Sequence, residues 1–318
     1  MATMLRWTIP AVFAICSLQA GVAVTKVAAT KKSDGHIHIE VDGKPFTDFY
    51  YGPDAPKPYL HPLRSASGQI VTRSFPMENL PGESTTDQHH RGVWLAYRDV
   101  NGYDFWQNEF SYNNKNAGKV VTRSVGDLKS GKDRGSFRGT FAWLSPAGNA
   151  ILEETRTMTF SGDARLRIVD VDIILKALVE TTFGDAKDGA FSVRLAEPLT
   201  EKNSGTITNS EGGRKMDQTW GKPASWVDYS GELNGEKLGV VLFEHPSSFR
   251  HPSRWHVRDY GLLAINPFGS NSFDKAAPVS KFVLPAGKSV RLRYRIVIHP
   301  AMDAAEIEKM FRAFASEP

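Results

Sequence analysis

The strongest constraint on the fold is a strict two-residue alternation near the C-terminus. Apolar side chains occupy positions 290, 292, 294, 296 and 298, and Arg291, Arg293 and Arg295 lie between them. Successive side chains of a β-strand point to opposite faces of its sheet. The segment 290–298 is therefore predicted to form a half-buried antiparallel strand, with one face in a core and one solvated, basic face.

Similar patterns recur along most of the chain. Segments that alternate or are rich in β-branched and aromatic residues, separated by Gly, Pro and Asn, lie at 36–41, 45–51, 93–97, 136–144, 153–160 and 164–175. The apolar run 238–243 predicts a central strand, and 281–284 is expected to pair with 290–298. Strands and helices do not alternate, which argues against a Rossmann or TIM fold. The predicted fold class is all-β: a large antiparallel β-sandwich forming one domain over residues 24–318.

One segment has helical rather than strand periodicity. Asp303 is a favourable N-cap, and Glu306 three residues later completes a capping-box pattern. The apolar residues that follow recur at helical spacing, at Ile307, Met310, Phe311 and Phe314. We expect a short C-terminal helix that covers an edge or a face of a sheet.

The N-terminus carries the features of a cleaved secretory signal at residues 1–23. Arg6 precedes the apolar run 7–18, and small residues at Gly21 and Ala23 suit signal peptidase. Export to the periplasm or the extracellular space is therefore expected. The only cysteine, Cys16, lies in this leader, so the mature chain has no thiol nucleophile. No other apolar run approaches about 18 residues, so no stable membrane span is expected in the mature chain.

The charge balance argues against nucleic acid as a partner. The chain has 39 Lys and Arg against 35 Asp and Glu, a formal net charge of +4. Nucleic-acid binding usually requires a stronger, clustered basic signal. The sequence does not specify an oligomeric state.

Histidines are the residues that point to chemistry. Four of the nine precede proline, at positions 61, 245, 251 and 299, which places them at strand ends and loops. For His299 we expect simple strand termination. His256, Arg258 and Tyr260 share one face of a strand, while Trp255, Val257 and Asp259 share the other. If Val257 faces the core, the first row faces outward into a cleft.

These residues predict a site for a sugar-like ligand. Candidate catalytic residues are His90, His245 and His256, which suit general acid/base work at neutral pH, with Asp259 as a carboxylate partner. Arginines bind carboxylates or sugar hydroxyls, and tryptophans stack on sugar rings. Candidate binding residues are His61, Arg64, His89, Trp94, Trp106, Arg194, Glu197, Trp226, His251, Trp255, Arg258 and Tyr260.

Three functions remain open from these residues. The first is a secreted or periplasmic carbohydrate-active enzyme with histidine acid/base chemistry, of the epimerase, lyase or hydrolase type. The second is a non-catalytic glycan-binding module that needs the tryptophans alone. The third is a metal-dependent enzyme with a histidine cluster. No metal-ligand spacing such as H-E-x-x-H occurs, so no cofactor is predicted.

Several motifs resemble those of a known family. They are KPYLHPLRS at 57–65, DQHHRGVW at 87–94, DVNG at 99–102, AEP at 196–198, ITNSEGG at 207–213, WVDYSG at 226–231, EHP at 244–246, WHVRDY at 255–260 and NPFG at 266–269. The chain resembles a bacterial family of unknown function whose members often carry the label "methane oxygenase PmoA". The resemblance implies secreted partners of carbohydrate catabolism with a supersandwich similar to that of sugar mutarotases. Membrane methane oxygenase chemistry is not expected, because the apolar spans it needs are missing.

Overall fold

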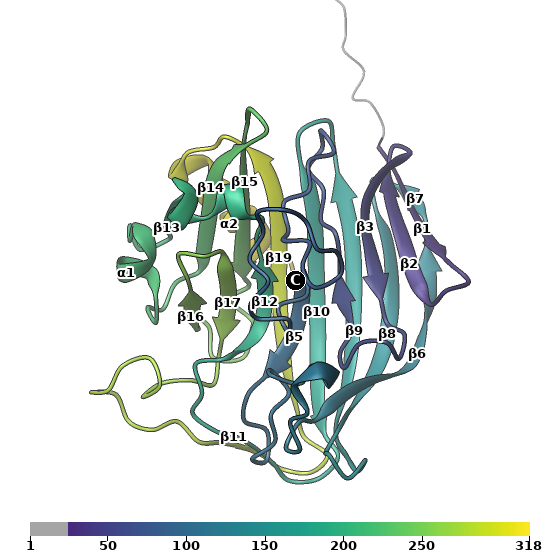
Figure 1. Ribbon diagram of the computed structural model, residues 1–318, viewed down its shortest axis with the longest axis vertical. Coiled ribbons are helices and arrows are strands. Elements are labelled where there is room, and N and C mark those ends of the chain that lie inside the picture. The colour runs from purple at the N-terminus through teal and green to yellow at the C-terminus, as the bar shows by residue number, and fades with distance from the viewer. Residues whose placement is uncertain (1–24) are drawn as a thin grey trace, which may run out of the picture.

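The computed structural model describes residues 25–318 as two large sheets packed face to face, joined by loops of unequal length (Figure 1). The predicted leader at 1–23, with Cys16, lies outside the described residues. Within 25–318, no helix is both long and apolar enough to cross a membrane. The all-β, antiparallel sandwich prediction is confirmed.

The first sheet has nine strands, and its neighbouring strands are antiparallel. Their order is β16 (Arg254–Val257), β17 (Leu262–Asn266), β12 (Gly189–Arg194), β5 (Val93–Tyr97), β4 (Tyr59–Leu60), β3 (Lys44–Tyr50), β2 (His36–Val41), β1 (Lys26–Lys31) and β7 (Gly131–Lys132).

The second sheet has eight strands, also antiparallel. Their order is β13 (Thr206–Asn209), β14 (Trp226–Leu233), β15 (Glu236–Glu244), β19 (Ser289–Pro300), β10 (Arg167–Ala177), β9 (Ala150–Gly162), β8 (Gly135–Leu144) and β6 (Lys119–Lys129). The predicted central strand at 238–243 is β15, between β14 and β19.

The main core lies between the two sheets. On β19, the alternating residues Leu292, Tyr294 and Ile296 are buried in it, as the sequence predicts. The arginines between them face outward, but two of them do not simply face solvent. Arg291 pairs with Asp172 and Arg295 with Asp170, both carboxylates on the neighbouring β10. The basic face is therefore a set of cross-strand ion pairs.

One predicted strand pairing is wrong. The strand at 281–284 is found as β18 (Phe282–Leu284), but it pairs with β11 (Thr181–Phe183) in a separate two-stranded sheet. The reason is that β10 and β15 already occupy both edges of β19, so β19 has no unpaired backbone edge to offer.

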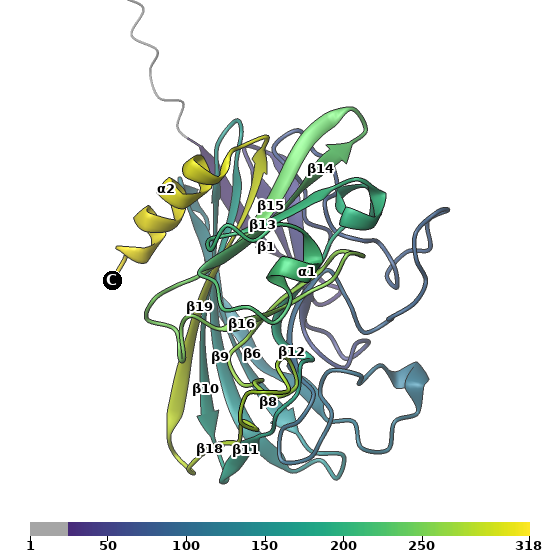
Figure 2. The same cartoon turned by 90° about the vertical axis from the view of Figure 1, so that its left-hand side faces the viewer.

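The C-terminal helix is found where the sequence predicts it. Helix α2 (Ala304–Ala315) begins with the complete capping box of Asp303 and Glu306. Its buried side chains Ile307 and Phe314 pack on Val241, Phe243 and Val297 of the eight-stranded sheet, together with Trp226. Figure 2 shows α2 lying against the outside of that sheet. The other helical segments are short: α1 (Lys215–Thr219) and 3₁₀ turns at Phe110–Tyr112, Glu197–Leu199 and Glu201–Asn203.

The outer face of the nine-stranded sheet is covered by loops instead of a helix. The segments that follow β4 and β5, at 61–92 and 98–118, extend over it on the side of the molecule away from α2 (Figure 2). A small apolar cluster lies beneath them, formed by Tyr59, Trp94, Ala96, Trp106, Leu262 and Ala264. This loop-covered face holds eight of the sixteen predicted site residues.

Candidate functional site

Predicted site residues from distant parts of the chain meet on the outer face of the nine-stranded sheet. The strands β16, β17, β12 and β5 lie side by side there (Figure 1). Together with the loops they bring eight side chains into one group, which we call the outer-face cluster: His89, His90, Trp94, Trp106, Arg194, His256, Arg258 and Tyr260.

Strand alternation explains which side chains face outward. On β5, Val93 and Leu95 enter the main core, so Trp94 between them faces the loops. On β16, Trp255 and Val257 enter the core, so His256 takes the outer face. The small outward residues Ala96 and Ala264 belong to the same apolar cluster as Trp106 and leave room for its indole above the sheet.

The aromatic rings of the cluster fix the two central imidazoles. Trp94 stacks on His90, with ring centroids 5.1 Å apart and planes 19° apart. Trp106 contacts His90 at 5.5 Å and stacks on His256 at 6.4 Å, again between centroids. His90 and His256 therefore lie against the same indole.

An arginine sets the tautomer of His256. Arg258 Nε donates a hydrogen bond to His256 Nε2 at 3.2 Å. A guanidinium can only donate, so Nε2 is the acceptor and the ring proton is on Nδ1. His256 Nδ1 is buried, lies 3.6 Å from Asp188 Oδ1 and has no hydrogen-bond partner in the described part of the chain. The carboxylate, the Nδ1–H and the acceptor Nε2 follow the order found in a histidine base oriented by a carboxylate, with Asp188 just beyond hydrogen-bond distance.

A second arginine sets the opposite tautomer on His90. Arg194 Nη1 lies 3.4 Å from His90 Nδ1. By the same reasoning Nδ1 accepts, and the proton of His90 is on Nε2. The cluster thus contains one imidazole with Nε2 as acceptor and one with Nε2–H as donor.

Burial keeps these imidazoles neutral. It lowers the pKa of His89 to about 2, and lowers that of His256 to about 3 although Asp188 opposes the shift. Burial, with His89 and Arg194 nearby, also holds the pKa of His90 well below its usual value. A neutral ring can accept or donate a hydrogen bond at any physiological pH.

The loop that carries His89 and His90 is held by a buried arginine that the sequence does not single out. Arg73 donates to the carbonyl oxygens of Phe75, Ser84, Thr86, Asp87 and His90. His89 Nδ1 lies 2.9 Å from the hydroxyl oxygen of the exposed Tyr112, which places the second covering loop beside the first. Asp188 is a further residue that sequence reasoning misses, because no local pattern links it to His256.

Asp87, His89 and His90 meet the simplest geometric requirement of a metal site. Each offers a ligand atom within 4.8 Å of the others. The surroundings fit a metal poorly, however. A ligating histidine normally donates its second ring N–H to an acceptor, whereas His90 receives a hydrogen bond from the cationic Arg194. The arrangement suits hydrogen bonding to an organic ligand better than cation binding.

Two of the predicted catalytic residues do not join the cluster in their expected role. His245 lies on the outside of the other sheet, with Nε2 3.1 Å from the carbonyl oxygen of Glu317 and its ring 5.0 Å from that of Phe314. Asp259 lies in the turn after β16, where its backbone N–H donates to Met216 Sδ and its carbonyl oxygen accepts from the backbone N–H of Lys202. The carboxylate beside His256 is that of Asp188.

Several predicted binding residues have structural contacts elsewhere. Trp226 packs under α2 and donates to Glu308, and Trp255 lies in the main core and donates to the Ala224 carbonyl oxygen. His251 pairs with the buried Glu244. The remaining three lie in or beside the loop region: His61, next to Thr72; Arg64, in a bridge with Ile70; and Glu197, which accepts from the backbone N–H of Ser84.

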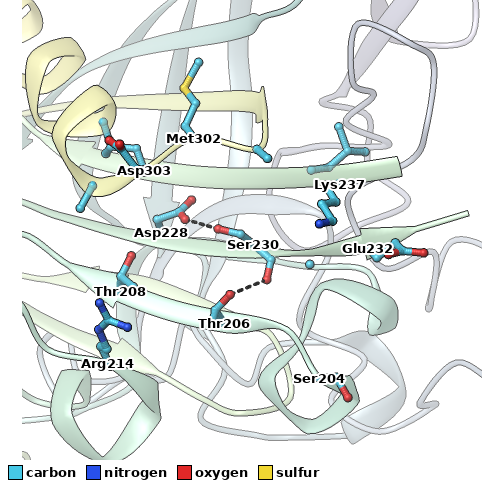
Figure 3. Close-up of a pocket in the computed structure, with 15 residues that line it drawn as sticks. Ser204, Thr206, Thr208, Arg214, Asp228, Ser230, Glu232, Lys237, Met302 and Asp303 are labelled. Carbon is cyan, nitrogen blue, oxygen red and sulfur yellow. Dashed lines mark hydrogen bonds between the residues drawn. The ribbon is translucent and has the colours of Figure 1, made fainter. Parts of the chain in front are cut away.

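A second polar site lies on the opposite face of the molecule. A hollow of about 490 Å³ is lined by β13, β14, β15 and the start of α2. Figure 3 shows Thr206, Thr208, Asp228 and Ser230 on neighbouring strands of this hollow. Ser230 donates to Asp228, and the buried His299 Nε2 lies 3.0 Å from the other carboxylate oxygen. The expectation of simple strand termination at His299 is therefore incomplete. In the sequence, the motifs ITNSEGG at 207–213 and WVDYSG at 226–231 are the features that could have pointed to this second site.

A glycine makes the pairing of His299 and Asp228 possible. Strand β15 lies between β19, which carries His299, and β14, which carries Asp228. A Cβ on Gly239 of β15 would lie 2.3 Å from His299 Cε1. The missing side chain lets the imidazole reach across the middle strand to its partner.

Comparison with known proteins identifies the family. A family model described as a family of unknown function (DUF6807) matches residues 36–312. No curated protein matches the sequence.

The solved structures that this chain matches are larger than it. The α-galactosidase AgaB of glycoside hydrolase family 36 from Geobacillus stearothermophilus is 11% identical, with a TM-score of 0.46 and coverage of 86% of this chain and 41% of its own. The galactosidase domain of the α-galactosidase-sucrose kinase AgaSK is 8% identical, with a TM-score of 0.46 and coverage of 86% and 42%. A glycoside hydrolase family 97 enzyme from Pseudoalteromonas sp. strain K8, in complex with acarbose, is 10% identical, with a TM-score of 0.34 and coverage of 87% and 34%. This chain thus spans less than half the length of each.

Proposed function

This chain belongs to the DUF6807 family of unknown function, and we propose that it is a carbohydrate-active enzyme that moves a proton at a sugar carbon. One observation carries the proposal. Two neutral histidines of opposite tautomer, His90 and His256, lie against the same indole, and each tautomer is set by an arginine. Such a pair supplies a proton acceptor and a proton donor in one place.

His256 is the base in this proposal. Asp188 faces its Nδ1–H and keeps Nε2 as the acceptor, which is the orienting role that a carboxylate plays beside a catalytic histidine. The N–H of Arg258 occupies the direction from which a substrate proton would approach Nε2. Arg258 is half-buried, so its side chain can turn toward a ligand and free that nitrogen.

His90 is the electrophilic partner. When Nε2 of His256 takes a proton from a carbon next to a carbonyl group, the electron pair of the C–H bond moves onto the carbonyl oxygen. The Nε2–H of His90 is available to donate to that oxygen and stabilise its developing charge. Return of the proton to the opposite face of the carbon gives epimerisation. Loss of a leaving group from the adjacent carbon gives elimination.

Hydrolysis of a glycosidic bond has less support. Glycosidases generally use two carboxyl groups on either side of the bond. Asp188 is held by Lys187 at 2.7 Å and Arg98 at 3.1 Å. A carboxylate engaged by two cations is a poor acid, which favours proton transfer at carbon.

The rim of the cluster is where a ligand would make first contact. The tryptophans are fully covered by the imidazoles and loops, whereas Arg258 and Tyr260 are half-buried and Tyr112 is exposed. These side chains combine hydroxyl and guanidinium donors with aromatic rings, the mixture that binds sugars. The leader predicted at 1–23 would place this chemistry outside the cytoplasm.

Solvent-proton exchange tests the proposal for epimerisation and elimination alike. In deuterated water the protein should incorporate deuterium into one of a set of hexoses and hexuronates, detected by NMR as loss of a single C–H signal. His256→Gln should slow this exchange by about 10²–10⁴-fold, and Asp188→Asn should also slow it.

The matched control is His38→Gln, on a half-exposed strand position far along the same sheet. It should exchange at the wild-type rate. Exchange in His256→Gln at the wild-type rate would falsify the proposal.

A further inference from the structure

Arg194 is a buried cation that has no counter-ion among residues 25–318. Its side chain, on β12, is 1% exposed. Its guanidinium lies 4.4 Å from the ring centroid of Tyr260, and Nη1 contacts His90. Among residues 25–318 no carboxylate lies within 4.0 Å of it, and its Nε is buried without a hydrogen-bond partner.

Arg73, on the same face, shows what a buried structural arginine looks like. It is 0% exposed and also has no ion pair within the described residues, but all three of its nitrogens donate to backbone carbonyl oxygens. Arg194 has the same depth and almost none of these bonds. The two arginines therefore differ in how many of their N–H groups have a hydrogen-bond acceptor.

This difference has a physical consequence. Burying a charge is costly unless hydrogen bonds and an opposite charge compensate for it. The free Nε and Nη2 edge of a guanidinium is the one that binds carboxylate and phosphate through two parallel hydrogen bonds. A side chain held in this state is prepared for an anion that arrives from outside.

The nearby carboxylates do not bind the free edge of the Arg194 guanidinium. Burial lowers the pKa of Arg194, and the charges of Asp87 and Glu197 only partly oppose that shift. Neither carboxylate is within ion-pair distance of the guanidinium. Glu197 already accepts hydrogen bonds from Ser84 and Asn203. Arg73 and Arg258 add positive charge on the same side of the cluster.

We propose that Arg194 binds an anionic group of the substrate, a carboxylate or a phosphate, so that the ligand of the outer-face cluster is an acidic sugar. The inference rests on the proposed function for the sugar, and on the buried, unsatisfied guanidinium for the charge. A carboxylate next to the reacting carbon also fits the chemistry. When His256 takes the proton from that carbon, the electron pair moves into the carboxylate, and Arg194 stabilises the added negative charge.

The first test needs no ligand. Arg194→Met removes a buried charge that forms no ion pair with any described residue. We expect its melting temperature to equal or exceed that of the wild type by up to about 4 °C. Arg73→Met is the matched control at the same depth. It leaves carbonyl oxygens unsatisfied and should melt well below the wild type or fail to fold. A loss of more than about 4 °C in Arg194→Met would mean that Arg194 is structural, and would overturn the inference.

The second test measures charge preference by calorimetric titration. The probes are D-galacturonate, D-galactose 6-phosphate and the neutral D-galactose. The wild type should bind at least one acidic probe about 10-fold or more tightly than galactose, as one bidentate ion pair allows. Arg194→Met should lose that preference and Arg194→Lys should keep part of it. The better of the two acidic probes identifies the anion.

The outcomes separate the two proposals. Equal affinity for acidic and neutral probes, or no binding of the acidic ones, overturns the acidic-sugar inference. Preference for an acidic probe that depends on Arg194, combined with undiminished proton exchange in His256→Gln, supports the inference while the proposed enzyme function fails.

Discussion

Two buried aspartate–histidine pairs lie on opposite outer faces of this sandwich, and they are built in opposite ways. Asp228 and His299, on the face that carries α2, are 3.0 Å apart, and His299 Nδ1 lies 2.7 Å from the carbonyl oxygen of Pro300. Asp188 and His256, on the loop-covered face, are 3.6 Å apart, and within residues 25–318 His256 Nδ1 has no hydrogen-bond partner.

The electrostatics of the two pairs also differ in sign. Burial tends to lower the pKa of His299, but the hydrogen bond and charge of Asp228 outweigh it and raise that pKa. For His256, burial dominates and lowers the pKa to about 3 despite Asp188. A closed pair with all its atoms satisfied contributes to stability. A pair left incomplete retains hydrogen-bonding capacity for a ligand.

The largest expected difference between the pairs is in stability. Asp228→Ala leaves His299 buried without its partner, and we expect a loss of about 3–5 kcal/mol in the free energy of unfolding. Asp188→Ala should cost about 1 kcal/mol or less, because its ion pairs are with the half-exposed Lys187 and Arg98. Urea denaturation of both variants measures this difference in the free energy of unfolding. Equal losses in the two variants would show that the two pairs do not differ in their contribution to stability.

A smaller effect is expected from the glycine beneath the closed pair. Gly239→Ala places a methyl group where the His299 ring lies, and should cost about 1–3 kcal/mol by overpacking. The control is Gly126→Ala on β6, where a Cβ would meet open space. It should change the free energy of unfolding little. A Gly239→Ala protein as stable as the wild type would show that the ring does not need this passage.

The smallest effect in the neutral range is the pH dependence of stability. The folded-state pKa of His299 is raised above its unfolded value of about 6.5, so its contribution is complete below that pH and is lost as pH rises through the folded pKa. His256 has the opposite sign: its folded pKa is lowered to about 3, so its contribution is present above about 6.5 and is lost as pH falls toward about 3.

Denaturation at a series of pH values checks both signs. His299→Gln should flatten the decline above about pH 6.5 and leave the acid side unchanged. His256→Gln should flatten the acid side only. A single variant that flattened both limbs would mean that the two pairs are coupled and are not independent sites.

Local sequence patterns were sufficient to predict individual strands and the C-terminal helix of this fold. The strand at 93–97 begins and ends where its composition predicts, and the capping box of Asp303 and Glu306 marks the start of α2. The alternation at 255–260 assigns His256 to the outer face and Trp255 to the core, as observed. Such features depend on neighbours within a few residues, which the sequence displays directly.

The sequence predicted only some of the residues that make up the site. His90 lies in the turn before β5, Arg194 on β12 and His256 on β16. They become neighbours through strand pairings between distant segments, and His90 and Arg194 are 104 residues apart in the sequence. His245 and His251, equally prominent in the sequence, pack elsewhere for the same reason. Asp188 and Arg73 have no local signature at all.

Periodicity within the chain was enough to specify which face of a strand each side chain occupies and where strands and the last helix form. Only the tertiary structure decided which strands became neighbours, and so which buried charges were neutralised. Asp228 and His299 meet because Gly239 lies between them, whereas no acid of residues 25–318 comes within ion-pair distance of Arg194. Alternation is a local steric property, but the pairing of charges depends on distances across the sheet that no local pattern encodes.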